Sequence, residues 1–166
     1  MSSDAEVLDG GCACGEVRYA MHGRPMFVHC CHCKWCQRET GSAFVLNALI
    51  ESGRIEITKG DPQAIVRPSE SGAGQTVWQC STCGVVLWST YKSAGDALRF
   101  LRAGTLDDTA KVEPDIHIFT TSKQPWVRIP DGARAVPEFY SFKEEWPAES
   151  LARFKAAREK AAKAGD

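Results

Sequence analysis

The eight cysteines of this 166-residue sequence fall into groups whose spacing suits metal binding. Cys12 and Cys14 form a C-x-C pair within GGCACGEVRY, and Cys80 and Cys83 form a C-x-x-C pair within WQCSTCGVVLW. A glycine follows each pair and allows the tight turn that directs two thiolates to one point. Four thiolates are the ligand set of a closed tetrahedral zinc site. The spacing therefore predicts a structural zinc that links the N-terminal strand to a central hairpin, with disulfides or inert buried thiols as the alternatives.

The segment HCCHCKWC, which starts at His29, holds the other four cysteines. Cys31, Cys33 and Cys36 have the spacing C-x-C-x-x-C and can bind one metal ion from a single loop that runs into a helical turn. Three protein ligands leave the fourth position open, which is the pattern of a catalytic zinc site. The alternative is a closed site with Cys30, His29 or His32 as the fourth ligand. Adjacent residues of an extended chain point in opposite directions, so Cys30 is the less expected ligand.

Most of the elements that position these cysteines are expected to be short β-strands. Runs of β-branched and aromatic residues recur between turn-forming residues, as is typical of a mainly β, antiparallel fold. The expected strands cover residues 16–21, 43–50, 54–60, 76–80, 85–91, 97–104, 115–121 and 126–129.

Two segments are expected to be helical. Residues 34–40 (KWCQRET) can form a single turn or a short helix beside the second cysteine group. Residues 148–165 follow Pro147 and are rich in strong helix formers, with Leu151, Phe154 and alanines as a thin apolar face. We expect one zinc-binding domain over residues 8–145 and a C-terminal surface helix within 146–166, docked by its first turns.

Charge and hydropathy argue against two classes of function, nucleic-acid binding and insertion into a membrane. The formal net charge of -1 gives no reason to expect nonspecific binding to nucleic acid or to anionic membranes. No stretch approaches the roughly 20 consecutive apolar residues of a membrane-spanning helix. The polar start MSSDAEVLDGG also lacks the apolar core of a signal peptide. The expected location is the cytoplasm, where thiols stay reduced and are available to bind metal.

Several motifs together resemble the glutathione-dependent formaldehyde-activating enzymes, a family that includes the centromere-protein-V-like proteins. They are GGCACGEVRY, CHCKWCQRETGSAF, CSTCG, PDIHIF and PW, in the family order. The resemblance implies a zinc-bearing β fold similar to that of a Rab-GTPase exchange factor. It also implies a structural zinc on Cys12, Cys14, Cys80 and Cys83, and a catalytic zinc on Cys31, Cys33 and Cys36, hence two zinc ions per chain.

The activity that the resemblance implies is that of a carbon–sulfur lyase. Its substrate would be the adduct of an aldehyde with a thiol, possibly glutathione. Candidate substrate-binding residues are Ser42, Arg38 and His117, although a turn cap, a solvated cation and a structural histidine are the respective alternatives. The alternative functions are a zinc-stabilised binding module without catalytic activity and a redox or metal-buffering role for thiolates near Cys30 and Cys31.

Overall fold

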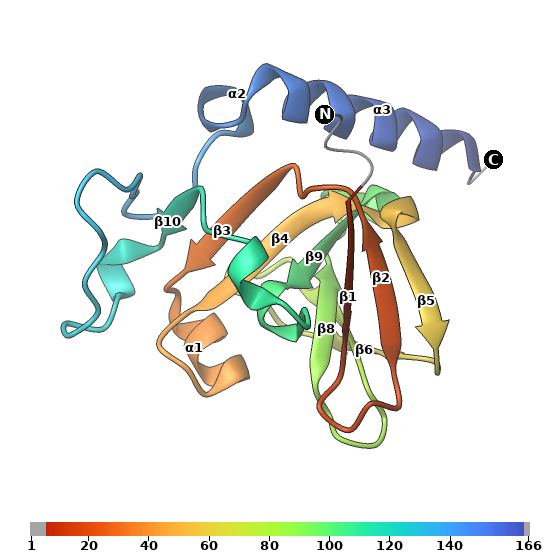
Figure 1. Ribbon diagram of the computed structural model, residues 1–166. Coiled ribbons are helices and arrows are strands. Elements are labelled where there is room, and N and C mark those ends of the chain that lie inside the picture. Colours follow the sequence, from red (N-terminus) through yellow and green to blue (C-terminus); the bar gives the residue numbers. More distant parts are fainter. Residues whose placement is uncertain (1–5, 165–166) are drawn as a thin grey trace.

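The computed structural model describes residues 6–164, and the strands in this range form two sheets (Figure 1). The smaller sheet contains β1 (Val7–Gly11), β2 (Arg18–His22) and β5 (Ile55–Lys59) in the order β1-β2-β5. Both of its strand pairs are antiparallel. The turn between β1 and β2 carries Cys12 and Cys14.

The larger sheet has seven strands in the order β10-β3-β4-β9-β8-β7-β6. All of its pairs are antiparallel except β10 with β3, which is parallel. The strands are β3 (Phe27–Cys31), β4 (Val45–Glu51), β6 (Gln63–Arg67), β7 (Gln75–Gln79), β8 (Val86–Thr90), β9 (Leu98–Arg102) and β10 (Ile116–Ile118).

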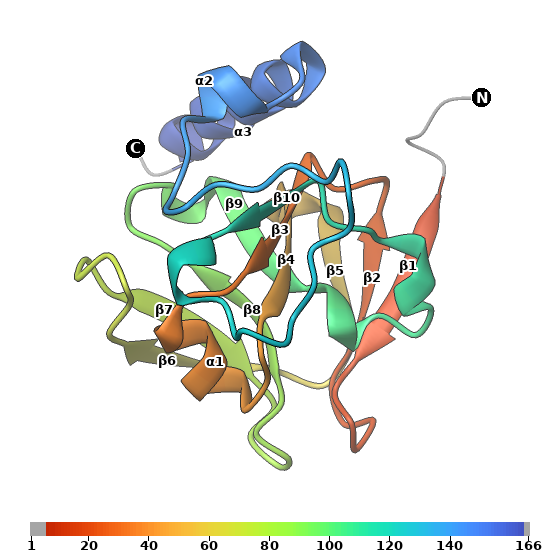
Figure 2. The same ribbon diagram turned by 90° about the vertical axis from the view of Figure 1, so that its left-hand side faces the viewer.

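Helices are few in the described range. The α-helices are α1 (Lys34–Thr40), α2 (Phe142–Glu145) and α3 (Ala148–Ala164), and in Figure 2 α2 and α3 lie across one end of the larger sheet. Short 3-10 turns are η2 (Ser52–Arg54), η3 (Gly95–Ala97), η4 (Ala103–Thr105), η5 (Thr109–Lys111) and η6 (Thr120–Ser122). None of the helices in residues 6–164 is both long enough and apolar enough to cross a membrane.

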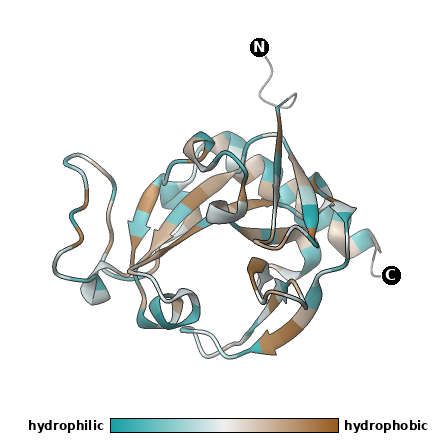
Figure 3. Cartoon of the chain, turned by 60° about the horizontal axis from the view of Figure 1, so that its bottom comes forward, coloured by the Kyte–Doolittle hydropathy of each residue, from teal (hydrophilic) through white to brown (hydrophobic). Residues whose placement is uncertain are grey.

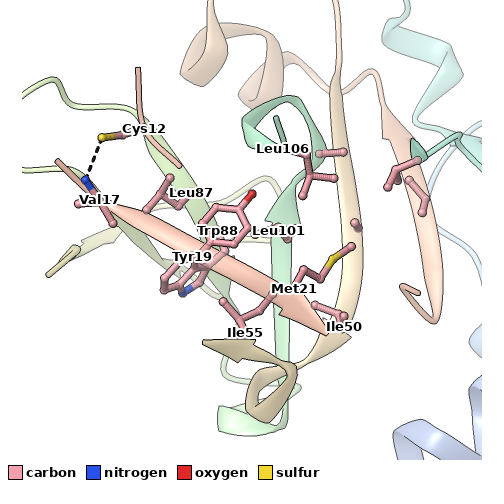
Figure 4. Packing of buried hydrophobic residues seen from close by; sticks show 14 of the residues in the cluster. Cys12, Val17, Tyr19, Met21, Ile50, Ile55, Leu87, Trp88, Leu101 and Leu106 are labelled. Atoms are coloured by element: carbon pink, nitrogen blue, oxygen red, sulfur yellow. Dashed lines mark hydrogen bonds between the residues drawn. The ribbon is translucent and has the colours of Figure 1, made fainter. Parts of the chain in front are cut away.

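One hydrophobic core lies between the two sheets. Tyr19 and Met21 of β2 are fully buried and pack with Leu87, Trp88 and Leu101 of the larger sheet (Figure 4). The rings of Tyr19 and Trp88 meet edge to face with their centroids 6.3 Å apart. Figure 3 shows hydrophobic and hydrophilic residues interspersed along the chain. Successive side chains of a strand point to opposite faces of the sheet, so only alternate residues of each strand reach this core.

A second core covers the opposite face of the larger sheet. Phe27 of β3, Leu49 of β4 and Phe100 of β9 belong to it, together with the three cysteines Cys31, Cys33 and Cys36. The C-terminal segment closes this core with Trp146, which is buried, and with Leu151 and Phe154 of α3. The second cysteine group therefore lies where the C-terminal segment meets the sheet.

The structure confirms the mainly β fold with a C-terminal helix, and it confirms the helix at 34–40. The expected strand at residues 126–129 is wrong, because this segment is irregular and flanked by Pro125 and Pro130, which cannot donate to a ladder. Sequence analysis missed β1, β3 and β6. The first contains two glycines, the second coincides with the start of the cysteine cluster, and the third is an edge strand with little buried surface.

Candidate metal and active site

The first cysteine group joins the tips of two hairpins from different sheets. Cys12 and Cys14 lie in the β1–β2 turn, and Cys80 and Cys83 lie in the β7–β8 turn. Their Sγ atoms lie within 4.8 Å of one another, with 3.5 Å between Cys12 and Cys14 and 3.7 Å between Cys14 and Cys80. Zn–S bonds of about 2.3 Å in a tetrahedron place neighbouring sulfurs about 3.8 Å apart. The four cysteines are free thiols and could hold a metal ion in this geometry.

Local backbone geometry aims these sulfurs at one point. Gly15 and Gly84, which follow the two pairs, have φ of 75° and 73°, in the left-handed region that glycine adopts without strain. The Val17 N–H donates to Cys12 Sγ at 3.2 Å, a bond drawn in Figure 4. Donation to sulfur favours the thiolate form that a metal requires.

The second group lies at the junction of β3 and α1. Cys31 ends β3, Cys33 is the N-cap of α1, and Cys36 lies in its first turn, with the Cys36 N–H donating to Cys33 Sγ at 3.3 Å. All three are buried, and their sulfurs lie within 4.8 Å of one another. Hydrogen bonds from Cys31 and Cys36 lower the pKa of the Cys33 thiol, whereas the interaction with Cys33 raises the pKa of Cys31. Deprotonation of Cys33 therefore disfavours deprotonation of Cys31, and a bound cation would offset this effect by stabilising all three thiolates.

A cavity of about 610 Å³ opens beside the second group. Cys31, Cys33 and Cys36 lie in its wall together with His29 of β3 and Asn47 of β4. Among the described residues this metal-binding group contains three ligand atoms and not four. A metal ion here would have protein on one side and the cavity on the other.

Glu39 fixes the helix that carries Cys36. Its buried carboxylate accepts from Arg102 Nη2 at 2.7 Å and from Gln75 Nε2 at 3.2 Å, and it pairs with Arg67 at 3.4 Å. These three partners come from β9, β7 and β6, so one side chain ties α1 to three strands. A buried ion pair with additional hydrogen bonds is costly to break, which favours a rigid position for Cys36.

Asn47 links this network to the cavity. Its Oδ1 accepts from Arg102 Nη1, and Asn47 and Arg102 face each other across the β4–β9 ladder. Among the described residues Asn47 Nδ2 has no hydrogen-bond partner. The Arg102 guanidinium can only donate hydrogen bonds, so the Asn47 amide must turn its oxygen toward Arg102. The N–H donors of Asn47 are then available to a ligand.

His29 and Tyr140 form a second polar feature of the cavity wall. The Tyr140 hydroxyl is hydrogen-bonded to His29 Nε2 and accepts from Trp146 Nε1 at 2.8 Å. Burial lowers the pKa of His29 to about 3, so its imidazole is neutral and accepts a hydrogen bond from the Tyr140 hydroxyl. Burial likewise raises the pKa of Tyr140. This pair joins β3 to the C-terminal segment as neutral hydrogen-bonding groups.

The structure separates the expected substrate-binding residues from the cavity. Ser42 and Arg38 are exposed and do not line it. His117 is buried next to β3, and its Nδ1 lies 3.0 Å from Nε2 of His32. Cys30 Sγ lies 3.5 Å from the same Nε2 atom, so Cys30, His32 and His117 make a third group that could hold a metal ion.

Sequence analysis missed Asn47, Glu39, Arg102 and Tyr140. Each depends on a contact between residues far apart in the chain: Asn47 and Arg102 are 55 residues apart, Glu39 and Arg102 are 63, and His29 and Tyr140 are 111. The only available signal was polar residues, such as Asn47 within AFVLNALI and Arg102 within ALRFLRAG, in runs that otherwise predict buried strands.

Comparison with known proteins identifies the family of the chain. A family model described as glutathione-dependent formaldehyde-activating enzyme matches residues 7–122. The chain belongs to this family. The match in the glutathione-dependent formaldehyde-activating enzyme family includes all eight cysteines and ends before the C-terminal segment that closes the second core.

The solved structures that match include one from a bacterium. The crystal structure of a Rhodobacter sphaeroides protein matches with a TM-score of 0.45 and 18% sequence identity, covering 64% of this chain and 92% of that chain. The family assignment depends on the match over residues 7–122 and not on this likeness.

Proposed function

We propose that the chain is a zinc-dependent carbon–sulfur lyase that cleaves the adduct of a thiol with an aldehyde. The family description points to a glutathione-like thiol and to formaldehyde as the reference substrate. The observation that carries the proposal is the position of Cys31, Cys33 and Cys36, three converging sulfurs in the wall of a 610 Å³ cavity.

Two zinc ions per chain fit the ligand sets. Cys12, Cys14, Cys80 and Cys83 would hold one ion that joins the two sheets and contributes to folding. Cys31, Cys33 and Cys36 would hold the other with an open position toward the cavity. A zinc ion there supplies Lewis acidity, which lowers the pKa of a bound thiol or polarises an aldehyde oxygen.

The reaction requires no oxidant or reductant. The adduct R–S–CH(OH)–R′ loses its hydroxyl proton to water as the C=O bond forms, the C–S bond breaks, and the electron pair stays on sulfur, which is then protonated by water. Negative charge passes through the adduct oxygen during this change. Asn47 Nδ2 donates to that oxygen, since Arg102 holds the other end of the amide.

The test must allow for spontaneous adduct formation. Exchange between free formaldehyde hydrate and the glutathione adduct is measured at equilibrium by NMR exchange spectroscopy, with and without zinc-loaded protein. We expect the exchange rate to rise in proportion to protein concentration, and Cys33→Ser to abolish the increase while circular dichroism stays unchanged.

Cys30→Ser is the matched control, because Cys30 points to the opposite face of β3 from Cys31 and does not line the cavity. It should keep the acceleration. An exchange rate that the zinc-loaded protein does not change, for the glutathione adduct and for other thiol adducts alike, would contradict the lyase and favour a zinc-stabilised binding module.

A further inference from the structure

The far wall of the cavity beside Cys31, Cys33 and Cys36 is built from aromatic rings of the C-terminal segment. Phe139, Tyr140, Phe142 and Phe154 all line it, and all lie beyond the family match at residues 7–122. Phe139 and Tyr140 stack with their centroids 5.0 Å apart, and Phe142 contacts Phe154 at 5.7 Å. The wall is therefore a continuous aromatic layer built from residues outside the family match.

Phe139 leaves apolar surface open to water. The residue is 49% exposed although its ring packs on Tyr140 and lines the cavity. Removing such a surface from water is favourable, and aromatic faces add a preference for stacked or edge-on rings. A ligand with an apolar ring would therefore gain binding free energy from contact with this wall, and a purely polar ligand would not.

The charges around the cavity do not match a ligand that is polar throughout. Apart from the cysteines and His29, the described lining residues whose side chains carry a charge at neutral pH are Glu70 and Arg158, and both are exposed. The Arg158 guanidinium lies 5.7 Å from the centroid of the Phe154 ring. Glutathione carries two carboxylates and an ammonium group. A single guanidinium at the edge, opposed by one carboxylate, cannot pair both carboxylates inside the cavity.

We propose that the substrate of the cysteine site carries an aromatic group that binds against Phe139, Tyr140 and Phe142, while charged parts of the adduct stay in solvent near Arg158. This inference rests on the proposed lyase function and names its substrate class. The aromatic group can belong to the aldehyde or to the thiol, since the wall recognises the ring and not its attachment.

Three adducts separate these sources: glutathione with formaldehyde, glutathione with benzaldehyde, and benzyl mercaptan with formaldehyde. The acceleration of exchange per protein molecule is measured for each with the zinc-loaded full chain. We expect one or both aromatic adducts to be processed at least about tenfold more efficiently than the glutathione–formaldehyde adduct, the scale of discrimination that an apolar pocket provides. Equal or better processing of the glutathione–formaldehyde adduct would overturn the aromatic substrate class and leave the lyase function standing.

A binding measurement tests the wall independently of catalysis. Benzyl alcohol, which has the ring but no thiol or aldehyde, is titrated into the zinc-loaded protein and followed by chemical-shift changes. We expect saturable binding that Phe139→Ala weakens about five- to tenfold, in line with the loss of part of a ring contact. Trp126→Ala is the matched control, because Trp126 is 73% exposed and does not line the cavity. Absence of saturable binding, or equal weakening by both variants, would overturn the inference.

Discussion

The Arg102 guanidinium donates from Nη1 to Asn47 Oδ1 and from Nη2 to Glu39 Oε2, so one buried side chain orients an amide of the cavity wall and anchors helix α1. The pairing register of β4 with β9 places Asn47 directly opposite Arg102. The same arginine thus sets the position of Cys36, through α1, and the direction of the Asn47 donors. Its two contacts connect helix α1, which carries Cys36, to the Asn47 amide of the cavity wall.

Asn47→Asp tests whether the amide donates to the substrate. The aspartate keeps an oxygen for Arg102 but replaces the N–H donors facing the cavity with a second oxygen. We expect kcat for adduct cleavage to fall by about 100- to 1000-fold, as when a donor to a developing oxyanion is removed, with a smaller change in KM. Asn47→Ala should also lower kcat, and it leaves Arg102 without one acceptor, so its free energy of unfolding should fall by about 1–3 kcal/mol.

The measurements are exchange kinetics for activity and urea denaturation for stability. If Asn47→Asp retains wild-type kcat, Asn47 does not stabilise the reacting oxygen and its contact with Arg102 serves only the fold. Comparable zinc contents of the variants and the wild type ensure that the effect does not arise from metal loss.

Metal analysis of cysteine variants tests the division into two zinc sites. We expect two zinc ions per wild-type chain, one in Cys33→Ser and two in Cys30→Ser. Cys12→Ser should lose the other ion and unfold more readily, because the first group joins the hairpin tips of the two sheets. The checks are elemental analysis after gel filtration and thermal unfolding with and without a chelator.

Cys30→Ser also decides the role of the third group. Its sulfur is close to His32 Nε2, but that atom is already within hydrogen-bond distance of His117. Three zinc ions in the wild type, with one of them lost in Cys30→Ser, would show that Cys30, His32 and His117 bind zinc and that the prediction of two ions is wrong.

Gly10 tests the contact between the smaller sheet and the core. A Cβ at this position would overlap the phenol ring of Tyr19 and lie 2.7 Å from the Thr105 carbonyl oxygen. We expect Gly10→Ala to lower the free energy of unfolding by about 1–3 kcal/mol, since neither neighbour can move without disturbing the core. Gly53→Ala is the matched control, because nothing lies within 4 Å of a Cβ built there. Urea denaturation of both variants measures the difference, and equal stabilities would mean that Tyr19 can shift at little cost.

The cysteine groups were predictable because metal ligands come in short local patterns. Cys31, Cys33 and Cys36 lie within six residues, and the glycines after the other two pairs reveal their turns. The sequence pattern also predicted the mainly β fold and the helices that follow Cys33 and Pro147. The assignment of roles to the cysteines came from the family resemblance as much as from their spacing.

The cavity was not predictable in the same way. Asn47 and Arg102 meet only because β4 and β9 pair in one register, and nothing local fixes that register. Tyr140 reaches His29 across 111 residues of sequence. Ser42, Arg38 and His117 were selected because they lie in or near the motifs. The structure exposes Arg38 on helix α1 and Ser42 just after that helix, and it places His117 of β10 beside His32.

Trp146 provides the last test, because it connects the C-terminal helix to the cavity wall. Its ring stacks on Phe142 with centroids 4.4 Å apart and on Phe27 of β3 at 5.6 Å, while its Nε1 donates to the Tyr140 hydroxyl. Trp146→Ala should lower the free energy of unfolding by about 3–5 kcal/mol, the cost of a large cavity in a core. Trp146→Phe keeps an aromatic ring but removes the N–H donor, and should cost about 1–2 kcal/mol.

The two variants separate packing from positioning of Tyr140. If the indole N–H holds Tyr140 in the cavity wall, Trp146→Phe should weaken benzyl alcohol binding measurably even though it lowers the free energy of unfolding only modestly. Lys155→Ala, on the exposed side of α3, is the control and should change neither quantity. Unaltered benzyl alcohol binding in Trp146→Phe would mean that His29 and the neighbouring rings alone position Tyr140, and that the indole contributes only to packing of the helix.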